Sequence, residues 1–179
     1  MAVPKRFLPI LIASSFLLHV RPVRCSEPEI VGSLRFSNQV QNALLLLKAR
    51  DAEAYCIITN YVGRIERGSR SGMWAYKKPP TYEMSDTNAF YSLTWCAATI
   101  AHDSFHSKLY HDYRKDHPGG VPDTVWTGRV AERLCMKHQL SVMEHIGASK
   151  WEMEYAKRQE DGKYVKDGET WREYRKRAW

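Results

Sequence analysis

The run from Asn88 to His102 contains no Asp, Glu, Lys or Arg. A helix without charge on any side is typical of an element that is buried almost all the way round. We therefore predict a long helix from about Asn88 to Tyr113, started by Asp86 or Thr87, at the centre of the fold. The rest of the chain must cover that helix, and a hydrophobic content of 44% is ample for this.

Shorter elements are predicted on both sides of the central helix. The run from Tyr55 to Ile65 is rich in β-branched and aromatic residues, which favours a strand but leaves a helix open. Pro79 and Pro80 favour an edge strand or a bent strand beside them. The other expected elements are a helix at Asn38–Ala52 capped by Ser37, strand-like runs at Met73–Tyr76 and Thr81–Met84, a third helix from about Thr124 or Val125 to Ile146, and a short helix at Ser149–Arg158.

The first 25 residues read as a secretory signal peptide. Lys5 and Arg6 precede an uncharged run from Phe7 to Val20, which has the length of a signal core and is too short to span a bilayer. The residues before Ser26 make a poor cleavage site, so an uncleaved membrane anchor stays open as an alternative. We expect an exported chain, with one α+β domain over residues 26–162.

Residues 163–179 form a basic, aromatic C-terminal tail. A net charge of +7 is concentrated at the chain ends, which argues against nucleic acid as the partner. In an exported protein such a tail favours an anionic surface. The alternative is a terminal segment that packs its aromatic rings on the domain and leaves its charges in water.

Two histidines on the central helix are the strongest candidates for chemistry. His102 and His106 are four residues apart, so both project from one helix face and can share a metal ion. The acid between them, Asp103, makes the run His-Asp-x-x-His, which differs by one residue from the His-Glu-x-x-His signature of zinc hydrolases. The alternative is a pair of core histidines bonded to backbone or solvent.

A third ligand is expected from the third helix. His111 is nine residues from His102 and points about 180° away, while His117 depends on a loop whose path the sequence leaves open. Glu132 shares a helix face with apolar residues, where a carboxylate is costly unless it is paired or binds a metal. An ion pair with Arg64 or Arg129 is the alternative for Glu132.

His102, His106 and a glutamate on a following helix resemble the metal site of gluzincins, which are zinc metallopeptidases. The resemblance covers about Met73 to Gln139, including the strands before the histidine helix. It implies a compact zincin-like α+β domain, with a small antiparallel sheet packed on the histidine helix and the glutamate helix. It also implies one zinc ion per chain, bound by His102, His106 and Glu132, and hydrolysis of a peptide bond by metal-activated water.

By the same resemblance Asp103 takes the place of the general base. The family has glutamate there, and aspartate is one methylene shorter, which limits its reach to the water. Asp103 is therefore either a weakened base or a group that orients a ligand histidine. Tyr82 and Tyr110 are both candidates to stabilise an oxyanion.

Four cysteines, Cys25, Cys56, Cys96 and Cys135, are present. Export implies an oxidising compartment, and loss of Cys25 with the signal leaves one pair and one buried thiol. If the histidine and glutamate helices converge on one metal, Cys96 and Cys135 approach each other, and we predict a disulfide between them.

Two other functions remain open. The pairs His102-Asp103 and His111-Asp112 superficially resemble the metal signature of HD-type phosphohydrolases, although the second pair faces away from the first. The non-enzyme alternative is an exported metal-binding or interaction protein. We expect a zinc-dependent metallopeptidase, with an exported non-catalytic protein as the alternative.

Overall fold

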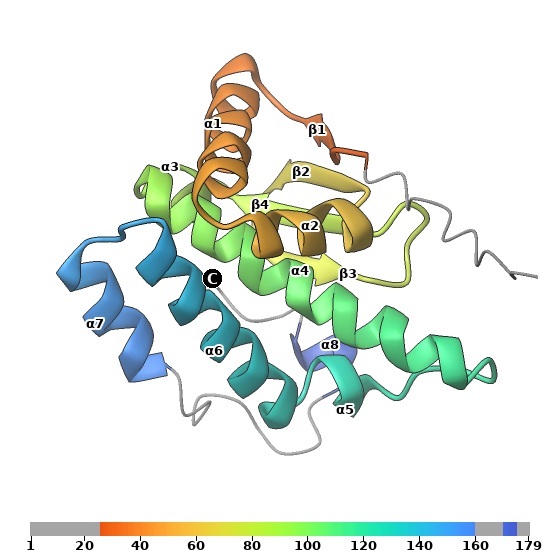
Figure 1. Ribbon diagram of the computed structural model, residues 1–179. Helices are drawn as coiled ribbons and strands as arrows, with labels where there is room; N and C mark the ends of the chain where they lie inside the picture. The colour runs from red at the N-terminus through yellow and green to blue at the C-terminus, as the bar shows by residue number, and fades with distance from the viewer. Residues whose placement is uncertain (1–25, 160–169, 175–179) are drawn as a thin grey trace, which may run out of the picture.

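The computed structural model describes residues 26–159 and 170–174 (Figure 1). The signal segment at 1–25 and most of the tail at 163–179 therefore lie outside the described residues. The described strands are β1 (Glu29–Val31), β2 (Arg64–Gly68), β3 (Gly72–Trp74) and β4 (Thr81–Ser85). The described helices are α1 (Leu34–Arg50), α2 (Ala52–Tyr61), α3 (Asp86–Phe90), α4 (Leu93–Asp116), α5 (Asp123–Trp126), α6 (Arg129–His145), α7 (Lys150–Gln159) and α8 (Trp171–Tyr174).

The mixture of helices with one small sheet confirms the α+β class. The strand order is β1-β2-β4-β3. β1 pairs with β2 and β2 with β4 in parallel, and β3 alone pairs antiparallel, with β4. The predicted antiparallel sheet is therefore wrong for two of the three strand pairs.

The parallel pairing follows from the segment between β1 and β2. Parallel neighbours need a crossover connection, and here α1 and α2 provide it. The strand that we favoured over Tyr55–Ile65 is mostly helix, because Asp51 accepts a hydrogen bond from the Ala54 backbone N–H at 3.0 Å and caps α2. Most of these β-branched and aromatic residues therefore lie in a helix, which ends just before β2.

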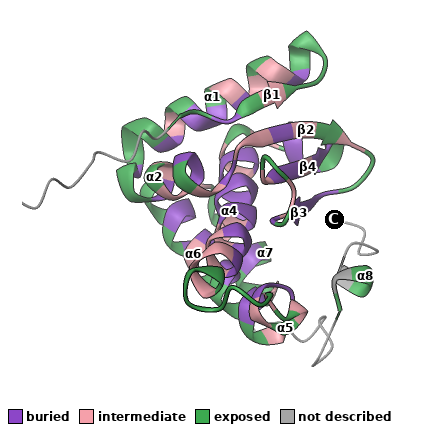
Figure 2. Cartoon of the chain, turned by 90° about the vertical axis from the view of Figure 1, so that its right-hand side faces the viewer, coloured by how far each residue is buried: buried purple, intermediate pink, exposed green. Residues whose placement is uncertain are grey.

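The central helix is present but broken near its start. Ser85 caps α3, the chain bends at Tyr91 and Ser92, and Ser92 then caps α4 by accepting a hydrogen bond from the Trp95 backbone N–H at 2.8 Å. α4 contacts α1, α2, β3 and α6, and its buried surface shows plainly in Figure 2. The prediction that this helix is buried on most sides is confirmed.

The predicted third helix is divided into α5 and α6. Gly128 is the N-cap residue of α6, and the helix ends at Ile146 and Gly147, where the sequence pattern placed its end. α6 lies along α4, so residues on facing sides of the two helices are brought together (Figure 1). No helix in the described ranges has the length and apolar character needed to cross a membrane.

Candidate metal centre

His102 and His106 face each other one turn apart on α4. Their Nε2 atoms lie 3.1 Å apart, and their ring centroids 4.9 Å apart. The side chain of His106 is fully buried, and that of His102 keeps 12% of its exposure. The two rings thus direct nitrogen atoms at one point, as the spacing predicted.

The backbone fixes the orientation of His106. Its Nδ1 lies 2.5 Å from the carbonyl oxygen of Trp126, the last residue of α5. A carbonyl only accepts, so Nδ1 carries a proton and donates it, and in the neutral ring Nε2 is then the nitrogen with the lone pair, aimed at His102. Metal-binding histidines are oriented in this way by a hydrogen bond to the other ring nitrogen.

Glu132, on α6, meets both histidines. Its Oε2 lies 3.4 Å from Nε2 of His102 and its Oε1 lies 3.5 Å from Nε2 of His106. The carboxylate is fully buried. Arg64, which was one alternative partner for it, instead contacts Glu29 at 2.8 Å and Glu66 at 4.0 Å.

The separations among these three side chains fit one tetrahedral ion. Zinc bonds to nitrogen and oxygen are about 2.0–2.1 Å long, so two ligands of a tetrahedral site lie about 3.3 Å apart. The two Nε2 atoms are 3.1 Å apart, and the contacts of 3.4 and 3.5 Å, which go to two different oxygens of Glu132, lie close to that value. The side chains at this point therefore fit a bound ion.

Cys135 is a fourth potential donor at this point. Ligand atoms of His102, His106 and Cys135 all lie within 4.8 Å of one another, so these three side chains can hold a metal ion. Burial, followed by the charges of Glu132 and Asp103, raises the pKa of the Cys135 thiol well above its usual value.

The role that we predicted for Cys135 is wrong. Cys96 and Cys135 are both free thiols, so the predicted disulfide between them is absent from the structure. Burial raises the pKa of Cys96 to about 12, and its sulfur lies 3.9 Å from that of Met84. The signal for Cys135 as a donor was its place one turn after Glu132 on the same helix face.

The charge around His102 favours a cation. Burial alone lowers the pKa of this histidine, but a hydrogen bond to Glu132, the negative charges of Glu132 and Asp103, and Gln139 together raise it above its usual value. Nδ1 of His102 is buried and has no hydrogen-bond partner in the structure. The ring therefore lies in a negative environment with one nitrogen unsatisfied.

Asp103 is buried between α4 and the sheet. It keeps 6% of its exposure. Burial, followed by the charge of Asp103, raises the pKa of Tyr82 well above its usual value. Tyr110 instead accepts a hydrogen bond at 3.0 Å from Arg114. Of the two tyrosine candidates, Tyr82 is the one coupled to Asp103.

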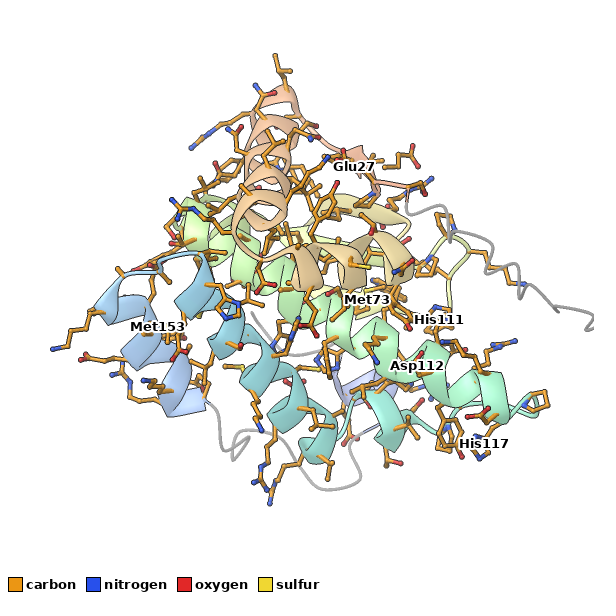
Figure 3. The ribbon with its side chains drawn as sticks, in the orientation of Figure 1. Glu27, Met73, His111, Asp112, His117 and Met153 are labelled. Carbon is orange, nitrogen blue, oxygen red and sulfur yellow. The ribbon has the colours of Figure 1, made fainter. Side chains whose placement is uncertain are left out.

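The remaining histidine candidates lie elsewhere. His111 and Asp112 lie in the C-terminal part of α4, and His117 is its C-cap residue (Figure 3). Asp112 pairs with Lys108 and Lys115 at 2.5 and 2.6 Å, and the His117 ring stacks on Tyr113 with centroids 3.9 Å apart. The second His-Asp pair is thus not brought to the metal centre.

Comparisons with known proteins give no match: no family model, no curated protein and no solved structure is significantly similar to this chain.

Proposed function

We propose that this chain binds one zinc ion through His102, His106 and Glu132 and uses it to hydrolyse peptide bonds. The observation that carries the proposal is that Glu132 meets both histidines: their Nε2 atoms lie 3.1 Å apart, and Oε2 and Oε1 of Glu132 lie 3.4 Å from His102 and 3.5 Å from His106. Imidazole and carboxylate donors in tetrahedral arrangement favour zinc over the harder ions magnesium and calcium.

Asp103 and His106 have different roles in the proposed reaction. Zinc in such a site acidifies a water molecule and polarises a carbonyl group. With zinc bound, Asp103 would be the group that accepts a proton from such a water, and the influence of its charge on the pKa of His102 and of Tyr82 supports this role. His106 is held in its ligand orientation by the Trp126 carbonyl.

The sheet supports an extended peptide as the substrate. β3 is an edge strand, it runs antiparallel to β4, and it contacts the histidine helix α4. Extended peptides bind by adding a strand to such an edge. Export of the chain and contact of residues 163–179 with an anionic surface remain proposals beside this one.

A non-catalytic zinc site is the second candidate, and burial favours it. His106 and Glu132 are fully buried and Asp103 nearly so, whereas a catalytic zinc needs a position open to water and substrate. In this case the ion would have a structural role only, as a link between α4 and α6.

Zinc content and peptide turnover of the full chain test the proposal. We expect about one zinc per chain and zinc-dependent cleavage of a mixed peptide library. Asp103→Asn should keep zinc and lower turnover by roughly 10²–10⁴-fold, the effect of losing a general base. Asp103→Glu tests whether the usual side-chain length restores or impairs turnover.

Asp112→Asn is the matched control. It removes an acid from the same helix, at a place where Asp112 pairs with lysines away from the site, and it should leave turnover unchanged. Bound zinc without turnover in any variant would support the non-catalytic alternative. A chain that binds no zinc would end the metal proposal.

A further inference from the structure

Two helices contribute two potential donors each around the rings of His102 and His106. α4 contributes His102 and His106, four residues apart, and α6 contributes Glu132 and Cys135, three residues apart. Residues at these spacings lie on one face of a helix. α4 and α6 pack along each other (Figure 1), so the two donor pairs face one another across the contact.

We propose that Cys135 Sγ is the fourth protein ligand of this zinc site and that it keeps the site closed to water. The inference rests on the zinc site proposed above, and it describes that site before water or substrate has bound. Cys135 Sγ lies within 4.8 Å of a ring nitrogen of each histidine, and Cys135 and His106 are fully buried. As the sulfur–zinc bond forms, the S–H bond breaks and the proton passes to solvent.

The coordination number supports this assignment. Tetrahedral zinc takes four ligands, and sites in which all four come from the protein are closed. Such a site explains how Glu132 and His106 are fully buried around an ion, since no position has to face water. Hydrolysis then requires the Cys135 sulfur to leave the ion before water can bind.

Cys96 shows what an ordinary buried thiol looks like in this chain. It is also free and fully buried, but its sulfur lies beside the Met84 thioether. Cys96 is therefore a matched control: the same residue type, with the same burial, on the helix that carries the histidines.

Cobalt substitution tests the proposal on the full chain. The reduced, metal-free protein is titrated with Co²⁺, and its absorption is recorded. We expect one ion per chain, the visible bands of tetrahedral cobalt, and a near-ultraviolet thiolate-to-cobalt charge-transfer band. Cys135→Ser should lose the charge-transfer band, whereas Cys96→Ser should keep it.

X-ray absorption of the zinc-loaded wild type gives an answer that needs no variant. One sulfur at about 2.3 Å with three nitrogen or oxygen neighbours at about 2.0–2.1 Å would support the proposal. Zinc with nitrogen and oxygen neighbours alone would overturn it and leave the three-ligand site standing. A chain that binds neither zinc nor cobalt would overturn both the three-ligand site and the role of Cys135.

Turnover separates the closed state from the hydrolase itself. If Cys135 blocks the water position, Cys135→Ala should hydrolyse peptides faster than wild type at equal zinc occupancy. Equal or slower turnover in a zinc-loaded, folded Cys135→Ala protein would overturn the blocking role. Sulfur at the ion with no turnover in either protein would keep Cys135 as a ligand and remove the hydrolase.

Discussion

His106 has two ring nitrogens committed to different partners. Nδ1 contacts the Trp126 carbonyl, and Nε2 faces His102 and Glu132. The first contact requires a proton on Nδ1, so in the neutral ring Nε2 carries the lone pair, in a fully buried place. A lone pair so placed is stabilised by a cation, which makes His106 the most constrained of the proposed ligands.

We predict that His102→Ala and His106→Ala each abolish stoichiometric zinc binding, because each removes one of three donors. Metal analysis after gel filtration should fall from about one zinc per chain to background. His117→Ala is the control, since its ring stacks on Tyr113 away from the centre, and it should retain zinc. Full occupancy in either ligand variant would contradict the assignment.

Helical spacing in the sequence was sufficient to predict that His102 and His106 share one face of a helix and that Glu132 points into the core. It was not sufficient for Cys135. A buried cysteine fits a disulfide, a packed core or a metal site equally well, and the choice depends on how α4 and α6 dock. The distance between helices is a tertiary quantity that periodicity does not encode.

The Glu152 side chain links the N-termini of α4 and α7. Its carboxylate contacts the hydroxyls of Ser92 and Thr94 at the start of α4 and accepts a hydrogen bond at 2.8 Å from the Ser149 backbone N–H before α7. Burial raises the pKa of Glu152, but the hydrogen bonds from Ser92, Ser149 and Thr94 outweigh it and lower the pKa below its usual value. The carboxylate form therefore stabilises the fold.

We predict that Glu152→Gln lowers the free energy of unfolding by about 1–3 kcal/mol at neutral pH, the cost of weakening a buried charged hydrogen-bond acceptor. Urea unfolding of both proteins measures this. Because the folded pKa lies below the unfolded value of about 4.3, the contribution is complete above that pH and is lost as the pH falls below it. The stability gap between wild type and variant should therefore narrow in acid, and a constant gap would refute the mechanism.

The ends of helices and strands could be predicted from the sequence only where a local signal sets them. Gly147 and the uncharged run of α4 were informative, since each acts on its own segment. The break at Ser92 was missed because its hydroxyl serves both the Trp95 backbone and Glu152, which is sixty residues further along the chain. The parallel pairing of β1 with β2 was missed because most of the α2 segment was interpreted as a strand.

At the scale of the whole molecule, the proposed ion joins α4 to α6 inside the fold. A ligand that binds only the folded state adds about 4 kcal/mol of stability at a thousand times its dissociation constant. We predict that a strong chelator lowers the melting temperature by roughly 10 °C. Calorimetry of the full chain with and without chelator measures the shift.

His106→Ala should melt at the same temperature with and without chelator, because it has no zinc to lose. An unchanged wild-type melting temperature after verified zinc removal would show that the ion is not coupled to folding.

The division of the donors between α4 and α6 also sets an order in time. The last donor emerges from the ribosome more than thirty residues after His102, beyond the whole loop between the two helices. Early in synthesis α4 can offer only two nitrogens, which hold an ion weakly. With the proposed zinc site, full capture of the ion would wait until α6 docks on α4, and an ion retained in the finished protein would report that docking.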